Sequence, residues 1–172
     1  MLQKYKQRAV KIIFAGYIFV VMIITQFPIK LPFKIDITKV QYNLVPFYFL
    51  IKRIEALREA SRAGYNIKEY LLPTFEIIFK TFGYNIILFL PFGFLLPIIR
   101  KDCPLKKVTY YSFSFSLCIE VLQLISMIMT NNSGRCFDID DIIANTIGGI
   151  VGFYFCIISK RLLILIFKGV DL

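Results

Sequence analysis

The side chains best suited to chemistry in this chain are carboxylates and amides that lie within apolar runs. Glu120 and Gln123 are three residues apart in one run, so on a helix they would share a face. Asp141 and Asn145 are four apart in the next run and would share a face of their own. Ionisable groups inside a membrane span cost about 2.5–3.5 kcal/mol on insertion scales. Each such residue is therefore a candidate functional group.

The kinds of chemistry open to these residues are restricted by the absence of His from the sequence. That absence excludes His-dependent phosphatases, Ser-His hydrolases and HExxH metalloproteases. Carboxylate oxygens remain, and they are the ligands that hard cations such as Mg²⁺ prefer. Asp138 and Asp141 are thus a possible metal pair, and no organic cofactor is expected.

The composition indicates a membrane protein. Hydrophobic residues make up 58% of the 172 positions and the mean hydropathy is +0.69, whereas soluble domains are about 45–50% apolar. The net charge of +10 comes from Lys and Arg at the ends of apolar runs, so we expect contact with membrane lipid and no nucleic-acid partner. The four cysteines show no CxxC pair or zinc-like spacing and are predicted to be unpaired: Cys103, Cys118, Cys136 and Cys156.

Four apolar stretches approach the length of about 20 residues that a helix needs to cross a bilayer. We predict a single membrane domain over residues 1–172 with spans at about 10–27, 82–99, 108–129 and 139–159. The first span follows a basic segment but lacks a small-x-small cleavage site, which favours an uncleaved helix over a signal peptide. The cation-rich ends and the loop at 100–107 are assigned to the cytoplasm, so both termini are expected there.

The first outer loop, between residues 28 and 80, contains two further segments. Leu44–Ile51 is apolar but too short to cross, so it is predicted to be re-entrant or interfacial. From Lys52 to Tyr70 the charges alternate in sign with helical spacing, which predicts an amphipathic surface helix. The expected fold is an all-α membrane protein: a bundle of four transmembrane helices with these two additions in its first outer loop.

In this topology the polar residues of the last three spans lie at similar depth, near the outer side. Asn85 is near the outer end of the second span, and Arg135 and Asp138 are in the loop before the fourth. The pattern predicts a polar pocket that opens outward. Two simpler roles stay open: Asp138 can cap the fourth helix with Asp141 as its capping-box partner, and Arg135 can neutralise the aspartates.

A stripe of small residues continues along the fourth span. Gly148 and Gly152 form a small-xxx-small pattern that allows another helix to approach closely. The stripe is therefore predicted to serve helix packing, and an oligomer could form through the same two glycines.

Four motifs in this order resemble the VanZ-like membrane proteins, a family named for a teicoplanin-resistance protein. They are YNLVPF at 42–47, NIILFLPFGFLLP at 85–97, IEVLQ at 119–123 and RCFDIDDIIANTIGGIVG at 135–152. The resemblance implies a multi-pass protein of the bacterial inner membrane, associated in its namesake with low-level teicoplanin resistance. It implies pocket residues at positions that match the family pattern: Asn43, Asn85, Glu120, Gln123, Arg135, Asp138, Asp141 and Asn145.

Three functions are compatible with these observations. The leading hypothesis is an envelope protein whose outward pocket engages a lipid-linked precursor, a lipoglycopeptide or another lipophilic molecule. The alternative from another class is a membrane enzyme that acts on a lipid-linked envelope substrate, with Glu120 as general acid or base. The third is a structural partner in envelope assembly that docks through the glycine stripe.

Overall fold

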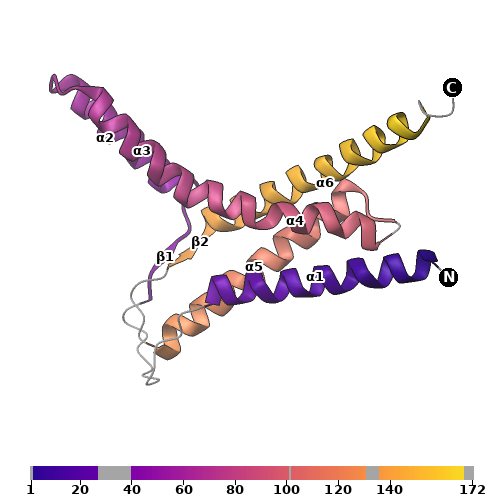
Figure 1. The fold of residues 1–172 in the computed structure, drawn as a ribbon. Coiled ribbons are helices and arrows are strands. Elements are labelled where there is room, and N and C mark those ends of the chain that lie inside the picture. The colour runs from indigo at the N-terminus through magenta and orange to yellow at the C-terminus, as the bar shows by residue number, and fades with distance from the viewer. Residues whose placement is uncertain (1, 27–39, 101, 131–135, 169–172) are drawn as a thin grey trace.

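The computed structural model describes residues 2–26, 40–100, 102–130 and 136–168. The described chain is almost entirely helical, as Figure 1 shows, with one pair of very short strands. The all-α membrane class predicted from the sequence is confirmed. In chain order the elements are α1 (Leu2–Gln26), β1 (Tyr42–Asn43), α2 (Tyr48–Arg62), α3 (Ile67–Ile78), the π-helix η2 (Phe79–Gly83), α4 (Tyr84–Ile99), α5 (Leu105–Thr130), β2 (Phe137–Asp138) and α6 (Ile139–Lys168).

Within the described residues, four helical segments are long and apolar enough to cross a membrane: Lys4–Gln26, Ile67–Ile99, Leu105–Thr130 and Ile139–Leu165. The second differs most from its predicted bounds of about 82–99, because α3, η2 and α4 run on without a break. Its 33 residues would span about 50 Å, more than the roughly 30 Å of hydrocarbon in a bilayer. The helix bends near η2 (Figure 1), so only part of it can belong to the bundle.

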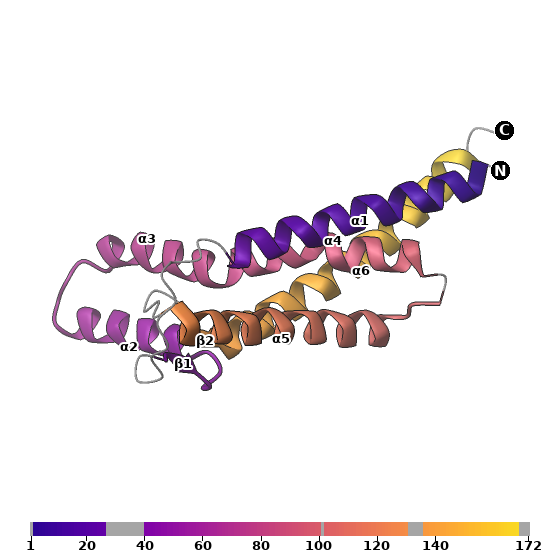
Figure 2. The same ribbon diagram turned by 90° about the horizontal axis from the view of Figure 1, so that it is seen from below.

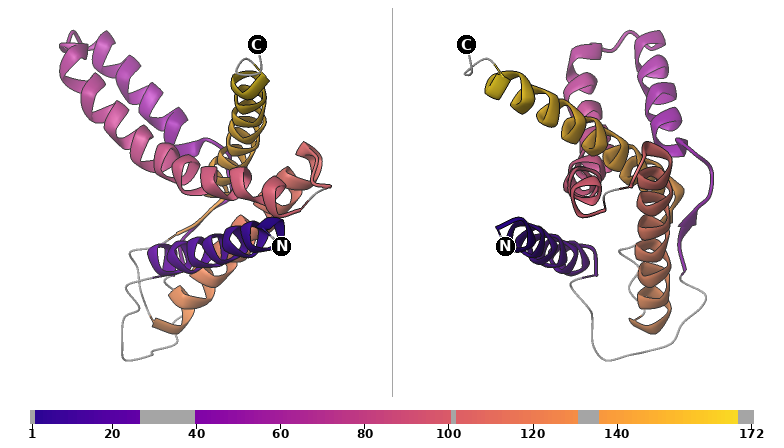
Figure 3. Two further views of the ribbon diagram at one scale, coloured as in Figure 1. Left: turned by 45° about the vertical axis from the view of Figure 1, so that its right-hand side comes forward. Right: turned by 90° about the vertical axis from the view of Figure 1, so that its right-hand side faces the viewer.

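The N-terminal part of this long helix forms an arm with α2 that extends away from the bundle (Figures 1 and 3). The amphipathic helix predicted for Lys52 to Tyr70 is instead divided: α2 ends at Arg62 and α3 begins at Ile67. Gly64 makes the break with φ of 78°, a left-handed conformation that glycine adopts without steric cost. Asn66 then caps α3, since its side chain accepts a hydrogen bond from the Lys68 N–H at 3.2 Å.

Segment 44–51, predicted to be re-entrant or interfacial, contains a turn and the first residues of α2. Its apolar side chains are largely exposed in the isolated chain, with Leu44 57% and Val45 56% accessible. The structure therefore describes no membrane-entering hairpin in this segment. An interfacial location, with these side chains against lipid, stays a prediction.

The closest helix pair is α4 and α6, which pack backbone to backbone at glycines. A Cβ added to Gly152 would lie 2.0 Å from the Leu90 carbonyl oxygen, and one added to Gly93 would lie 1.8 Å from the Gly149 carbonyl oxygen. No larger side chain fits at these distances. The glycine stripe therefore serves packing within the chain, and an oligomer through Gly148 and Gly152 stays a prediction.

An aromatic cluster joins the other two spans to this pair. Phe92 of α4 lies 5.5 Å from Phe14 of α1 and 5.4 Å from Phe115 of α5, measured between ring centroids. The Tyr17 hydroxyl donates a 2.6 Å hydrogen bond to the Leu88 carbonyl and so anchors α1 to α4. Burial of these rings supplies contact area and offset ring packing at one depth of the bundle.

The two ends of the bundle differ in kind. The start of α1, the connection between α4 and α5, and the end of α6 lie at one end, whereas the strands and the start of α6 lie towards the other (Figure 2). The first of these ends carries the basic clusters Lys4–Lys11 and Arg100–Lys107. The second carries most of the buried polar side chains.

The glycine packing gives a stability prediction. Gly152→Val should push α4 away from α6 and lower the free energy of unfolding by about 1–3 kcal/mol or more, as expected for overpacking. Thermal unfolding of the purified protein in detergent micelles measures the loss. The matched control is Gly16→Ala on α1, where an added Cβ would meet nothing within 4 Å. That variant should be at least as stable as the parent, and a parent-like midpoint for Gly152→Val would contradict the packing.

Candidate functional site

The site begins with the pairing of two strands that are far apart in sequence. β1 and β2 run parallel, with Tyr42 opposite Phe137 and Asn43 opposite Asp138. The Asn43 side-chain amide also donates to a carboxylate oxygen of Asp138, at 2.9 Å. This ladder holds the segment after α1 against the start of α6. With two residues on each side, the strands lack the alternating pattern by which strands are predicted.

Asp138 makes several hydrogen bonds at the start of α6. Its backbone N–H donates to Glu120 Oε2 of α5 at 3.0 Å, and its Oδ1 accepts from the Asp140 N–H at 2.9 Å. The second bond is the N-cap interaction predicted for the start of α6. The predicted capping-box partner is different, because the Asp138 N–H is directed to Glu120 and not to Asp141.

Asp140 performs a role that the sequence did not indicate. Its Oδ1 accepts a 2.6 Å hydrogen bond from the backbone N–H of Phe47, directly before α2. Phe47 has φ of 60°, a left-handed conformation that is unfavourable for a bulky residue. Its ring stacks on Phe82 with the centroids 6.0 Å apart. The carboxylate and the ring contact together hold this turn, so the YNLVPF motif is fastened to the first turn of α6.

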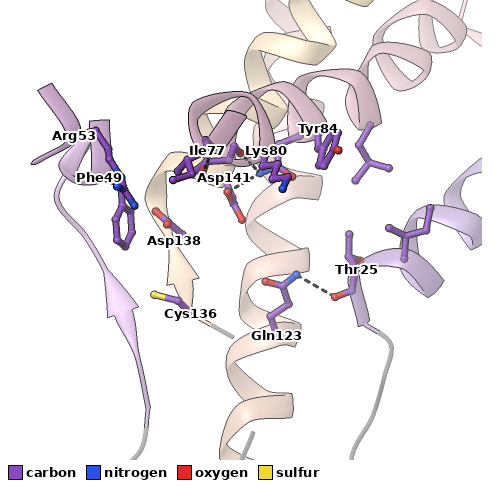
Figure 4. A pocket seen from close by; sticks show the side chains of 14 residues that line it. Thr25, Phe49, Arg53, Ile77, Lys80, Tyr84, Gln123, Cys136, Asp138 and Asp141 are labelled. Carbon is purple, nitrogen blue, oxygen red and sulfur yellow. Dashed lines mark hydrogen bonds between the residues drawn. The ribbon is translucent and has the colours of Figure 1, made fainter. Parts of the chain in front are cut away.

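Amide side chains link the remaining helices. Asn85 Nδ2 donates to Asp141 Oδ1 at 2.6 Å and to the Thr81 carbonyl at 3.0 Å. Gln123 donates to the Thr25 carbonyl at 3.1 Å, which joins α5 to the end of α1 (Figure 4). Asn145 donates to the Ser116 hydroxyl at 2.8 Å in a buried seam between α5 and α6. These three amides thus each have a partner on another segment, as burial in an apolar environment requires, whereas the buried Ser112 hydroxyl has no hydrogen-bond partner in the described part of the chain.

A cavity of about 810 Å³ opens among these elements. Four of the eight residues predicted for a pocket line it: Asn85, Gln123, Asp138 and Asp141 (Figure 4). The other lining residues are Ile24, Thr25, Phe49, Arg53, Ile77, Lys80, Thr81, Tyr84, Leu88 and Cys136.

The remaining predicted residues have other positions. Asn43 and Glu120 hydrogen bond to Asp138 from behind the cavity wall. Asn145 lies one turn further along α6, against Ser116. Arg135 lies outside the described residues. Asn43 and Glu120 are therefore positioning residues in this arrangement, while Asp138 and Asp141 face the cavity.

Sequence reasoning did not assign Arg53 and Lys80 to the site. Arg53 belongs to the stretch of alternating charges at 52–70, which is typical of a solvated helix surface, and Lys80 is a single cation just before the predicted second span. They reach the cavity only because α2 folds back beside α3 and because η2 continues into α4. Gly64 and Asn66 give the turn of the arm a local signal, but no local pattern shows where the arm lies relative to the bundle, so the two cations could not be distinguished from their neighbours.

The acidic residues do not form a recognisable metal centre. Among the described residues, no group of three or more His, Cys, Asp or Glu side chains is arranged to hold a metal ion. A metal at Asp138 and Asp141 stays a prediction. The predicted lack of cysteine pairing is confirmed, since all four cysteines are free.

The short β2 strand separates this cavity from a second one of different character. Successive strand residues point to opposite sides, and Asp138 lines the polar cavity while Phe137 lines an apolar cavity of about 500 Å³. The apolar cavity is bordered by Leu44 and by residues of α5 and α6 such as Phe113 and Ile143. The strand pair therefore separates the two cavities, with a polar side chain facing the first and an apolar side chain facing the second.

The helices and the cavity define a multi-pass α-helical membrane protein with a mixed-polarity site at the end of the bundle that carries the strands. The model of the VanZ/LLP1 family matches residues 14–163. The chain therefore belongs to the VanZ/LLP1 family. No curated protein and no solved structure gives a significant match to it.

Cys136 provides a chemical probe of the cavity wall. Partial burial raises the pKa of this thiol above its usual value, and the negative charges of Asp138 and Glu120 raise it further. Because the thiolate is the reactive form, alkylation of Cys136 by a soluble maleimide should be slower at pH 8 than alkylation of glutathione. As the pH is raised further, the alkylation rate of Cys136 should still increase at the pH where the rate for glutathione has become constant. A variant with the other three cysteines replaced by Ser isolates the signal, and a glutathione-like pH profile would contradict this environment.

The Asn43–Asp138 bond gives a second prediction. Asn43→Ala should leave a buried carboxylate oxygen without one of its donors and destabilise the protein by about 1–3 kcal/mol. It should also accelerate Cys136 alkylation, because β1 no longer covers β2. Tyr42→Phe is the matched control on the same strand, since the Tyr42 side chain is 68% exposed. Equal alkylation rates in the two variants would show that the strand pairing does not depend on this bond.

Proposed function

We propose that this protein is an envelope membrane protein whose cavity binds the polar head of a lipid-linked or lipophilic molecule and thereby reduces the action of lipoglycopeptides such as teicoplanin. The observation that supports this most directly is the mixed lining of the cavity. Charged and amide groups of α6, α4 and α5 lie beside apolar residues of α1 and α4, such as Ile24 and Leu88. An amphiphile needs this combination, with its head on polar groups and its tail towards hydrocarbon.

The location of the cavity supports the same proposal. The start of α1, the α4–α5 connection and the end of α6 share one end of the bundle (Figure 2), and they carry clustered Lys and Arg. By the positive-inside rule this end belongs in the cytoplasm of a bacterial cell, with both termini. The cavity then lies on the outer side of the cell membrane, where a lipoglycopeptide with an acyl tail and lipid-linked wall precursors are found.

The family supports the biological role. The VanZ-like proteins are named for a teicoplanin-resistance protein, and the match covers 14–163, including all the cavity-lining residues. Six of the fourteen lining residues lie in the motifs by which the chain resembles that family: Asn85, Leu88, Gln123, Cys136, Asp138 and Asp141.

A second candidate, a membrane enzyme acting on a lipid-linked envelope substrate, is favoured by one observation. Asp138 and Asp141 both line the cavity, so a reactive carboxylate would have access to a bound headgroup. Turnover of a labelled polyprenyl-linked substrate by the purified protein, lost in Asp141→Asn, would support the enzyme. Binding without turnover would support the binding protein.

The resistance phenotype tests the proposal. In a susceptible bacterium, expression of the chain should raise the teicoplanin concentration needed to stop growth severalfold. It should have less effect on a glycopeptide without an acyl tail. Asp141→Asn should remove most of this protection, because the cavity loses a charge that faces the ligand while Asn85 keeps a polar partner. Glu120→Gln should act in the same direction through Asp138.

The control for this experiment is Glu69→Gln, which removes an exposed carboxylate on α3. It should protect like the parent. Membrane levels of every variant are measured by immunoblot, so that loss of protein is separated from loss of function. Full protection by both Asp141→Asn and Glu120→Gln at normal levels would overturn the proposed role of the cavity.

A further inference from the structure

We propose that the cavity recognises a zwitterionic headgroup, with its phosphate bound by Arg53 and Lys80 and its primary amine bound by Asp138 and Asp141. The chemical class is an aminophospholipid of the phosphoethanolamine type. This inference rests on the proposed function, since it names the head that the cavity would bind.

The first support is the charge distribution around the cavity. Arg53 comes from α2 and Lys80 from η2, whereas Asp138 and Asp141 come from β2 and the first turn of α6. In the view of Figure 4 the two aspartates lie between the two cations. Four charges of both signs therefore border one volume, with acidic groups on the bundle side and basic groups on the arm.

The second support is that these opposite charges do not neutralise each other. Across the described part of the chain, no ion pair joins Arg53 or Lys80 to either aspartate. Lys80 pairs with Glu76 one turn away on the surface, and both side chains are more than half exposed, so the pair is weak and easily exchanged. The carboxylates are instead held by amides and backbone N–H groups. The charges are thus separated by the space of the cavity.

The chemistry of the groups matches a zwitterion. A guanidinium and an ammonium are the usual partners of phosphate oxygens. A primary ammonium supplies three donors and carboxylates are acceptors only, so an amine near Asp138 and Asp141 would offset the cost of two acids in a partly apolar site. A purely anionic head would be repelled by the aspartates, and a purely cationic head would be repelled by Arg53 and Lys80. Only a head with both charges is complementary to the whole lining.

The apolar lining indicates that the zwitterion is the head of a lipid. Ile24 of α1 and Tyr84 and Leu88 of α4 border the same cavity, and Ile24 and Tyr84 are 61% and 57% exposed in the isolated chain. The cavity therefore has an apolar side whose residues are exposed on the surface that would contact the bilayer. An acyl chain attached to the head can leave along it.

The test uses the full chain in detergent micelles with four dioleoyl lipids added singly. These are phosphatidylethanolamine, its N-acetyl derivative, phosphatidylglycerol and a trimethylammonium lipid without phosphate. Retained lipid is measured by native mass spectrometry, and occupancy of the cavity by protection of Cys136 from maleimide. Phosphatidylethanolamine should bind about tenfold more tightly than its N-acetyl derivative or phosphatidylglycerol, as expected for loss of one charge-assisted hydrogen bond. The cationic lipid should bind weakest.

The variants assign each half of the head. Asp141→Asn should weaken phosphatidylethanolamine binding, because the amine loses a carboxylate, and strengthen phosphatidylglycerol binding, because a negative charge that faces the anionic head is removed, so that the preference between the two lipids is lost. The pair Arg53→Gln and Lys80→Gln should weaken both lipids. Arg58→Gln on α2 and Lys68→Gln on α3 are matched controls, because they remove cations from the same arm outside the cavity lining, and they should bind like the parent.

The outcomes separate this inference from the proposed function. Equal Cys136 protection by all phosphate-bearing lipids would overturn the amine recognition and leave an amphiphile-binding cavity in place. Protection by none of the lipids, together with full teicoplanin protection by Asp141→Asn, would overturn both. The lipid comparison on the parent protein alone decides the matter if Asp141→Asn proves unstable.

Discussion

The close approach of α4 and α6 is the contact on which the rest of the structure depends. Because Gly93, Gly148 and Gly152 carry no Cβ, the two backbones meet directly, and this brings Asn85 within hydrogen-bond distance of Asp141. A wider separation would leave that carboxylate unpaired inside a membrane segment, which is costly. The polar site is therefore a consequence of small residues packed about two to three helical turns further along α6. The same pair of helices, α4 and α6, thus provides both the close glycine packing and the Asn85–Asp141 hydrogen bond.

A second consequence is the fixed position of residues 40–47, which lead into α2. Within the described residues its attachment to α6 combines a two-residue ladder with side-chain bonds from Asn43 and to Asp140. Each is modest on its own, but all of them end on four consecutive residues, Phe137 to Asp140. The first turn of α6 thus serves as the common support for one wall of the cavity and for the start of α2. Its acidic residues act as acceptors for backbone and amide donors, and Asp138 also lines the cavity.

Much of the fold could be predicted from the sequence because each helix carries its own signal. Apolar length indicated the four spans, and helical spacing placed Glu120 with Gln123 and Asp141 with Asn145 on shared helix faces. The site was only partly predictable. Asn85, Gln123, Asp138 and Asp141 stood out as polar groups in apolar surroundings, whereas Arg53 and Lys80 looked like ordinary surface cations. Their place depends on the turn at Gly64 and on the continuous helix through η2, which are relations between segments. The strand pair was missed for the same reason, since two residues are too few to show a period.

The wide turn at Phe79–Gly83 gives the arm its angular setting. A π-turn holds one residue more than an α-turn, and one residue corresponds to a rotation of about 100° around the helix axis. A chain one residue shorter at this point would keep α4 and its contacts with α6. It would, however, rotate α3 and α2 about the helix axis and move Arg53 away from the cavity. The number of residues in this turn, rather than the identity of any side chain, thus determines which face of the arm points towards the cavity. Insertions or deletions in this turn would place other residues of the arm at the cavity and leave the packing of the bundle unchanged.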